Sequence, residues 1–491
     1  MRRRWSTRAR APLRARSLVV ATALACGCGS LRTPNPLVAV NPEAAAPARP
    51  DRSWEPSAEA TATLPAATDA AAEADRTLDL PALVDVALAA NPDTRDAWQA
   101  SRAAAARYGG ALEPYFPRVF AAAVVSPNER VLFQDTPDTL VIHQDSYVPE
   151  IALTYTLLDF GRRASAAEVA RERLVAANFS FNRSLQRVVF EVEAAFFVLD
   201  AAIALETAAQ QNVELARKVR EAADRRLSVG LATRPDALLA QQVETRALYE
   251  LESSRAAFRD AQAHLARTLG RPANRAPRIE PIATRPVPAD LASNVDALLE
   301  NALADRPDLA ARAAEVRASA AEVERTQAEF WPRVGFEGRY AEVFWDYTVQ
   351  GSARVRNSEP AYSTVFRLDW DVFRGFGREN ALRAARADSE RAASELEASR
   401  LDASVEVWSA YYDQLAARKK LAYAETLLKS SQDTYDATSR SYAMGLSDVV
   451  ALLTAERDLA TARYTLVRSR ADVLISAARL AYAVGSAAPG R

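Results

Sequence analysis

The sequence predicts an α+β protein made of two copies of one unit, each a β-hairpin at the end of a long antiparallel helical rod. Three observations predict this fold: landmark motifs recur in the same order in both halves, each half has a stretch with two-residue apolar spacing, and a long helical stretch follows it. Pro92 recurs as Pro307, 215 residues later, far beyond the period of about 20–50 residues of solenoid repeats. One large unit is therefore duplicated. The paired landmarks are Asn91-Pro92-Asp93 with Arg306-Pro307-Asp308, Phe116-Pro117 with Trp331-Pro332, Phe160-Gly161-Arg162 with Phe376-Gly377-Arg378, and Gly230-Leu231 with Gly445-Leu446.

The first 25 residues have the features of a secretory signal peptide. Seven arginines and no acid occupy the first 16 residues, and nine apolar or small residues follow. Cys26 and Cys28 come next, in a context that resembles the cleavage site of bacterial lipoproteins, so we expect lipid on one of them. The alternative is plain cleavage after Ala25. Residues 26–76 are rich in Pro, Ala and Ser, which predicts a lipid-anchored flexible tether.

The charge and the cysteine content limit which partners and which stabilising crosslinks the chain can have. The 62 basic and 63 acidic side chains nearly cancel, so nothing in the charge favours a nucleic-acid partner. The chain after Cys28 has no cysteine, which leaves neither disulfides nor thiolate metal sites to hold it together. We divide it into a first repeat at residues 77–285, a second repeat at 286–485 and a tail at 486–491.

Each repeat opens with an Ala-rich helical segment, predicted at residues 80–113 and 295–330. The segments stop before Pro114 and Pro332, because a proline disfavours helix at the residue before it.

The apolar spacing then changes from helical to two residues, which predicts hairpins over residues 118–158 and 333–373 with loops at 126–147 and 344–361. A hairpin of a soluble sandwich has the same pattern. However, Arg367, Asp369 and Asp371 lie opposite an aromatic stripe, which favours strands with one face in lipid and one toward a polar lumen. The alternating bulky residues are Ile151, Leu153, Tyr155 and Leu157, and Phe366, Leu368, Trp370 and Val372.

A very long helix follows each hairpin. Residues 162–229 contain no Pro or Gly, so one helix of nearly 70 residues, roughly 100 Å, is predicted. Apolar residues step by four and three, which is typical of a coiled-coil seam and requires long neighbouring helices. Glycine turns at Gly230 and Gly445 lead into return helices, predicted at 236–268 and 448–484. The seam residues are Leu185, Val189, Val192, Phe196, Leu199 and Ile203 in the first repeat, and Leu401, Val405, Trp408, Tyr412 and Leu415 in the second.

From about residue 78 to 485 the chain resembles the TolC family of outer-membrane efflux and secretion channels. No single motif is very specific, but their order, duplication and spacing together are. The motifs are Leu88-Ala89-Ala90-Asn91-Pro92, the strand entries at Pro117 and Pro332, Leu158-Asp159-Phe160-Gly161-Arg162-Arg163, and the tip segment from Gly445 to Arg457.

This resemblance implies a homotrimer in which each chain gives four strands to one shared transmembrane β-barrel in the outer membrane. The long helices then form an α-helical coiled-coil barrel across the periplasm that narrows to an aperture at the glycine turns. Substrates pass through it passively to the exterior. The implied partners are a periplasmic adaptor (membrane fusion) protein and an inner-membrane transporter of an efflux pump or type I secretion system. Drugs, metals and secreted polypeptides all remain open as substrates.

The aperture residues depart from the family pattern at one position. Family members often carry a carboxylate late in the second tip segment, where this chain has Thr454. Asp448 is the candidate replacement for an acidic ring, and N-capping of the return helix is the alternative role. Arg440 and Tyr442 lie where the family keeps closure contacts. Asp236 holds a related place in the first repeat, where we expect it to cap a helix.

An enzyme is not expected, and neither a cofactor nor a metal site is predicted. His143 and His264 lack catalytic partners in their sequence context, and Asp159-Phe160-Gly161 lacks the other segments of a kinase. The competing hypothesis is a soluble periplasmic coiled-coil adaptor or scaffold without a pore. It explains the signal and the heptads, but it does not explain two alternating hairpins at matching places in both halves.

Overall fold

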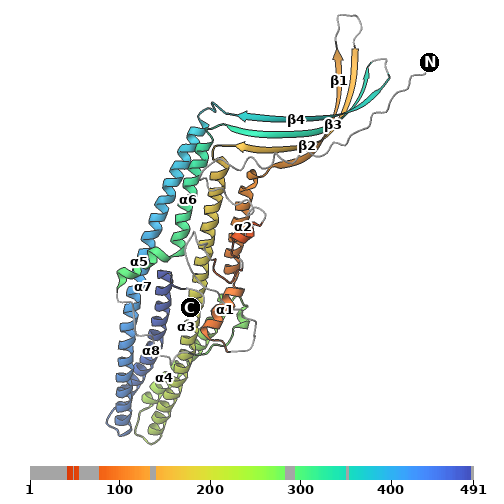
Figure 1. Cartoon of the computed structure of the whole chain (residues 1–491). Helices are drawn as coiled ribbons and strands as arrows, with labels where there is room; N and C mark the ends of the chain where they lie inside the picture. Colours follow the sequence, from red (N-terminus) through yellow and green to blue (C-terminus); the bar gives the residue numbers. More distant parts are fainter. Residues whose placement is uncertain are drawn as a thin grey trace, which may run out of the picture. The chain divides into compact units, whose positions relative to one another are not determined.

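The computed structural model describes residues 41–47, 49–54, 77–132, 140–281, 294–349 and 353–487. The predicted signal peptide, Cys26, Cys28, most of the predicted tether and the end of the tail lie outside these residues. Each repeat contains two short helices, two strands, a long helix and a return helix, in that order (Figure 1). The duplicated α+β architecture agrees with the sequence.

Each repeat opens with two short helices, so the single continuous helices predicted at 80–113 and 295–330 are wrong. Asn91 separates the first pair and Arg306 the second. Both residues precede a proline and have extended backbone, with ψ of 131° and 122°, because the proline ring disfavours helical conformation there. The helices are α1 (Leu80–Ala90), α2 (Pro92–Ala111), α5 (Val295–Asp305) and α6 (Pro307–Ala328), with 3-10 turns at Pro42–Ala45, Glu113–Tyr115 and Ala273–Arg275.

Four antiparallel strands form one sheet in the order β1-β2-β3-β4, so the two hairpins join through β2 and β3. Strand pairing continues into the segments 126–147 and 344–361, and the long loops predicted there are wrong. Pro127, for example, pairs with Asp145. β1 is an edge strand of this sheet, where a proline is tolerated, whereas in the central strand β2 the pairing with β3 skips Val148 and Pro149. The second hairpin ends at 369, short of the predicted 373. The strands are β1 (Arg118–Leu132), β2 (Leu140–Leu158), β3 (Arg333–Val349) and β4 (Val355–Asp369).

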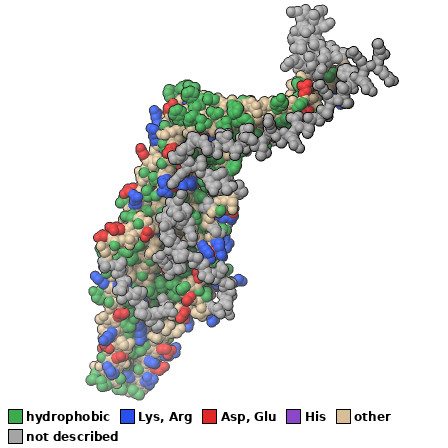
Figure 2. All heavy atoms as spheres, viewed as in Figure 1, with side chains coloured by type: hydrophobic (Ala, Val, Ile, Leu, Met, Phe, Trp, Pro, Cys, Tyr) green, Lys and Arg blue, Asp and Glu red, His purple; other side chains and the backbone are tan. Residues whose placement is uncertain are grey.

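One face of the sheet is aromatic. Phe336 and Phe366 pack with ring centroids 5.3 Å apart, and Tyr340 lies opposite Tyr362 in the register. Figure 2 shows hydrophobic side chains gathered where the sheet meets the helices. This face leaves large apolar side chains exposed, among them Val119, Ile151, Tyr340, Tyr362, Phe366 and Leu368.

The opposite face of the sheet is charged. The Arg339 guanidinium lies 3.6 Å from the Glu150 carboxylate and 3.2 Å from that of Glu337. Arg367 approaches Glu337 from the next strand at 3.9 Å. The two-faced alternation that the sequence predicts is therefore present.

The long helices have 67 residues each, roughly 100 Å at the usual rise. Each follows a tight turn in which a phenylalanine has positive φ, 52° at Phe160 and 62° at Phe376. The Phe160 ring stacks on Trp331, which helps to hold this strained backbone in place. None of the helices in the described ranges is both long and apolar enough to cross a membrane. The helices are α3 (Arg162–Ser228) and α7 (Gly377–Ala443), followed by α4 (Arg234–Thr268) and α8 (Val449–Val484).

The first predicted seam lies in the core of the protein. Leu185, Val189, Val192, Phe196 and Leu199 are buried against side chains of α1 and α4. This part of the coiled-coil prediction is confirmed.

The second predicted seam is exposed in the single chain, so its packing against neighbouring long helices stays a prediction. Leu401 and Val405 are 62% and 65% exposed, and Trp408 and Tyr412 are exposed as well. α7 instead buries Ala403, Val407 and Ala410, and the last two pack against α5 and α8. The reason lies in the neighbours: α3 packs against helices of both repeats, whereas α7 packs mainly against α5, α6 and α8.

Candidate functional site

The two glycine turns at the helix tips have the same geometry. Gly230 and Gly445 have φ of 76° and 78°, which only glycine adopts at little cost. Leu231 N donates to Arg226 O at 2.8 Å, and Leu446 N donates to Ser441 O at 2.9 Å. These bonds belong to the motif that ends many helices at a left-handed glycine.

The return helices start differently in the two repeats. Asp448 is the N-cap of α8, and its Oδ1 accepts a 2.8 Å hydrogen bond from Ala451 N. Asp236 instead forms a capping box with Thr233, whose backbone N and Oγ1 each donate to Asp236 Oδ2 at 2.8 Å. These hydrogen bonds lower the pKa of the Asp236 carboxyl. Asp448 and Asp236 therefore both stabilise the start of a helix. Both also lie at the helix tips, where a ring of carboxylates would attract cations.

Arg226 joins the two tips. Its Nη1 donates to the backbone oxygen of Tyr442, and its guanidinium lies 4.5 Å from the centroid of the Tyr442 ring. The sequence analysis singled out Tyr442 but missed Arg226. A signal was present, because Arg225 and Arg226 lie in the last turn of α3, where cations favour the helix dipole.

An apolar cluster lies beneath this bridge. Val219 of α3 packs with Tyr442 of α7 and with Val449, Leu452 and Leu453 of α8. Beside the cluster, a groove of about 590 Å³ runs between the ends of α3 and α7. Its lining combines apolar side chains with the cations Lys218, Arg225 and Arg226.

The other predicted site residues do not take part in the contact between Arg226 and Tyr442. Arg440 is exposed, and Thr454 is exposed with its Oγ1 donating to Val450 O at 2.8 Å. His264 is exposed on α4. His143 belongs to β2, and its side chain lies outside the described part of the structure.

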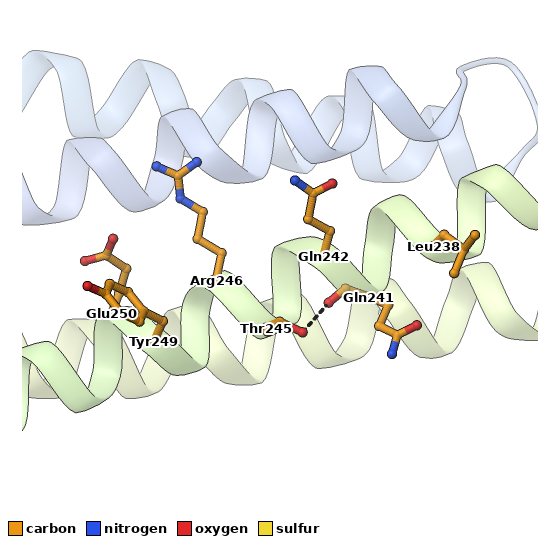
Figure 3. A pocket seen from close by; sticks show the side chains of 7 residues that line it. All are labelled: Leu238, Gln241, Gln242, Thr245, Arg246, Tyr249 and Glu250. Atoms are coloured by element: carbon orange, nitrogen blue, oxygen red, sulfur yellow. Dashed lines mark hydrogen bonds between the residues drawn. The ribbon is translucent and has the colours of Figure 1, made fainter.

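A second groove, of about 600 Å³, follows α4 (Figure 3). Gln242, Arg246 and Glu250 extend from α4 toward helices of the second repeat, and Thr245 Oγ1 donates to Gln241 O at 2.9 Å. Leu238 and Tyr249 add exposed apolar surface. The lining lacks the convergent titratable groups that catalysis needs, and it is consistent with a packing surface.

The sequence matches the model of the family described as outer membrane efflux protein, over residues 83–271 and 298–486. Each matched range covers most of one repeat, and the second range ends one residue beyond its repeat. The resemblance to TolC-family channels is therefore confirmed.

Two curated proteins and one solved structure illustrate the similarity. Protein CyaE of Bordetella pertussis is 30% identical over 82% of this chain and 85% of its own length. The alkaline protease secretion protein AprF of Pseudomonas aeruginosa is 27% identical over 70% of both chains. The structure of the outer membrane protein VceC of Vibrio cholerae has a TM-score of 0.67 at 19% identity, covering 83% of this chain and 96% of that one. At that identity the structural likeness shows the fold.

Proposed function

The chain belongs to the outer membrane efflux protein family, and on that premise we propose that three copies form one tunnel with its aperture at the Gly230 and Gly445 tips. Members of this family are outer-membrane channels that span the periplasm, and they are not a class of enzymes. Family membership favours a channel over the alternative of a soluble adaptor without a pore.

The exposed stripe on α7 supports assembly with further copies. On α3, the Phe190 ring stacks on Tyr482 of α8 at 5.3 Å, and Gln186 Nε2 donates to Gly485 O at 2.7 Å. In the structure the two long helices correspond at an offset of 215, since Arg163 donates to Leu157 O and Arg378 donates to Val372 O. At this offset Leu401 and Val405 lie on the corresponding side of α7, but they are exposed. In the first repeat, α8 packs against this side of α3. In the second repeat, no described helix of the same chain packs against the corresponding side of α7.

A second copy of this chain supplies the missing helix. By the symmetry of the repeats, α4 of the neighbouring copy takes the place against α7 that α8 takes against α3. The stripe of Leu401, Val405, Trp408 and Tyr412 is apolar enough to drive this packing. Repeating the contact around an axis closes a ring, which in this family has three chains.

The substrate class follows from the relatives. AprF carries the name of an alkaline protease secretion protein, which favours a polypeptide cargo and a type I secretion system for this chain. Export of small molecules is the second candidate, because the family is described by efflux.

The groove between the ends of α3 and α7 is the proposed docking place of the periplasmic adaptor. Its cations, Lys218, Arg225 and Arg226, favour an acidic helical segment. The exposed apolar side chains of Leu231, Met444 and Leu446 at the tips add contact area.

Asp448 is the proposed ring residue of the aperture. It lies three residues after Gly445, and in a trimer it places three carboxylates around one axis. Such a ring attracts cations. Tyr442, held by Arg226, is the proposed closure contact, while Arg440 and Thr454 present exposed polar side chains nearby.

The segment before α1 supports a lipid anchor at Cys26 or Cys28. Trp54 N donates to Asn182 Oδ1 at 2.9 Å, and Trp98 Nε1 donates to Pro47 O at 2.6 Å, so this segment is fixed to α2 and α3. Pro42 packs on Gly109, close to the strand end of α2. From Asn41, the 15 residues back to Cys26 can extend over at most roughly 50 Å.

Crosslinking in cells followed by identification of the captured inner-membrane protein tests the proposed function. A secretion transporter that exports polypeptides is the expected partner. Capture of a small-molecule pump alone would contradict the secretion assignment. Mass spectrometry of the mature N-terminus tests lipidation, since plain cleavage after Ala25 leaves an unmodified Cys26.

A further inference from the structure

Glu456 is a buried carboxylic acid in the tip region. It lies on α8, one turn beyond Leu452 and Leu453, and only 4% of its surface is exposed. In the described part of the chain, no hydrogen-bond donor reaches its buried Oε2. A carboxylate in such a place is costly, whereas a protonated carboxyl is much less so.

The helices around Glu456 offer no counter-ion. Tyr435 of α7 lies close enough to interact electrostatically with Glu456. Burial, with a smaller contribution from Glu456, raises the pKa of Tyr435. On α3, Lys218 and Arg226 line the neighbouring groove. On α4, Glu244 is paired with Arg220 at 2.6 Å.

Two cations of α8 follow Glu456 within two turns. Arg457 is exposed and lies 3.4 Å from Asp458. Arg463 is engaged elsewhere. Its Nη1 donates to Asn212 Oδ1 at 2.9 Å, and its Nη2 lies 3.4 Å from Gln432 Oε1. Burial raises the pKa of Glu456 from 4.5 to about 7. Within the described residues, no ion pair to Glu456 offsets this burial.

The carboxyl group of Glu456 has no counterpart at the same position of the first repeat. The residue at the same position of α4, 215 positions earlier, is the neutral Gln241, which is exposed. The first return helix has its own buried acid, Glu244, but that carboxylate is paired with Arg217 and Arg220. Among the described residues near the two tips, Glu456 is therefore the buried acid without an ion pair.

We propose that Glu456 makes the tip aperture respond to pH: its neutral form holds α8 against α3 and α7, and its ionised form loosens that packing. The inference rests on the proposed aperture at the tips. Separation of the two tips breaks the Val219, Tyr442 and Leu452 cluster one turn away and brings Glu456 into water. Water stabilises the carboxylate, so the separated arrangement releases a proton.

The direction of the effect follows from the proton count. The closed tip binds the proton more tightly than the open tip, so the closed state is favoured at low pH. The preference for the closed state over the open state falls as the pH rises from about 4.5 and is fully lost above about 7. Over this range the ratio of closed to open tips changes by at most roughly 300-fold per chain. Acidification of the periplasm therefore closes the channel.

Open probability in planar bilayers at pH 5.5 and pH 8 tests the proposal. The wild-type trimer is expected to open more at pH 8. The Glu456→Gln variant keeps the shape of the side chain without its charge. Its open probability is expected to stay low at both pH values. Glu425→Gln on the exposed side of α7 is the matched control and should behave as the wild type. Size-exclusion chromatography checks that each variant remains a trimer.

Two results would overturn the role of Glu456: a Glu456→Gln channel that keeps the wild-type response to pH, or a wild-type channel without one. The Arg226→Ala variant separates this failure from that of the aperture. If Arg226→Ala opens the channel while Glu456→Gln changes nothing, only the proposed role of Glu456 in the pH response is wrong. If neither variant changes the current, the aperture does not lie at the tips.

Discussion

Asn91 and Arg306, 215 residues apart, make the same connection in the two repeats. Asn91 Nδ2 donates to Thr268 O at 2.8 Å, and Arg306 Nη1 donates to Ala483 O at 3.0 Å. Each side chain thereby fixes the break between two short helices to the last turn of the return helix. The connection is duplicated although the residue type has changed.

Arg306→Ala is expected to destabilise the chain by about 2–4 kcal/mol. Arg306 is 5% exposed and also pairs with Asp308 at 2.7 Å and Glu406 at 2.6 Å, so its removal leaves two carboxylates and a carbonyl without this partner. Urea unfolding followed by circular dichroism measures the loss. Arg312→Ala, at an exposed ion pair, should cost less than about 1 kcal/mol. Equal effects of the two variants would show that the buried network is unimportant.

Gly270→Ala should destabilise the first repeat, whereas Gly110→Ala should not. Gly270 has φ of 66°, and an added Cβ would lie 2.5 Å from Ala90 O, so both strain and a clash with backbone result. Gly110 lies in α2 with open space around it, and alanine there should stabilise by about 0.5–1 kcal/mol. The urea midpoints of the two variants should move in opposite directions. A Gly270→Ala midpoint at or above that of the wild type would contradict the close approach of the two helix ends.

Val405→Asp is expected to dissociate the trimer without unfolding the chain. The change places a charge in the stripe that a second copy covers. The core of the chain should remain intact, because α7 buries other residues within the chain, among them Ala403, Val407 and Ala410. Light scattering in detergent gives the number of chains, and circular dichroism gives the helix content. Leu446→Asp, at an apolar position of the tip that is even more exposed, should stay trimeric. A trimeric Val405→Asp protein would place the interface on another face.

Asp448→Asn separates the charge of the proposed ring from helix capping. Asparagine caps a helix as well as aspartate, so α8 should start as before while three charges leave the aperture. The expected result is a lower ratio of cation to anion permeability in asymmetric salt. Asp448→Ala should in addition cost about 1 kcal/mol per chain. Unchanged selectivity in the asparagine variant would leave Asp448 with the capping role alone.

The sequence predicted the kind and order of most elements because their signals are local. The glycine turns at Gly230 and Gly445, the proline entries and the helical spacing of the Leu185 seam each depend on a few neighbouring residues. The strands beyond Ser126 and Phe344 were missed because their turn-type residues favour a loop, whereas pairing with the neighbouring strand decides the outcome.

The tip contacts needed the structure because they join distant segments. Arg226 and Tyr442 are 216 residues apart, and no local pattern links them. Burial of Glu456 likewise depends on the helices that pack against α8, which include α3 and α7. The seam at Leu401 was correctly recognised as apolar, but a single sequence does not tell whether its partner belongs to the same chain or to another copy.

Single-channel conductance of the Arg226→Ala variant tests the central claim most directly. The variant removes the bridge from α3 to the Tyr442 carbonyl and ring, whereas Arg225→Ala removes only an exposed ion pair with Glu221. We predict stepwise conductance from the wild-type trimer, a larger conductance from Arg226→Ala, and wild-type steps from Arg225→Ala. A trimer without conductance steps, or an Arg226→Ala channel with the wild-type conductance, would contradict a tunnel that closes at its helix tips.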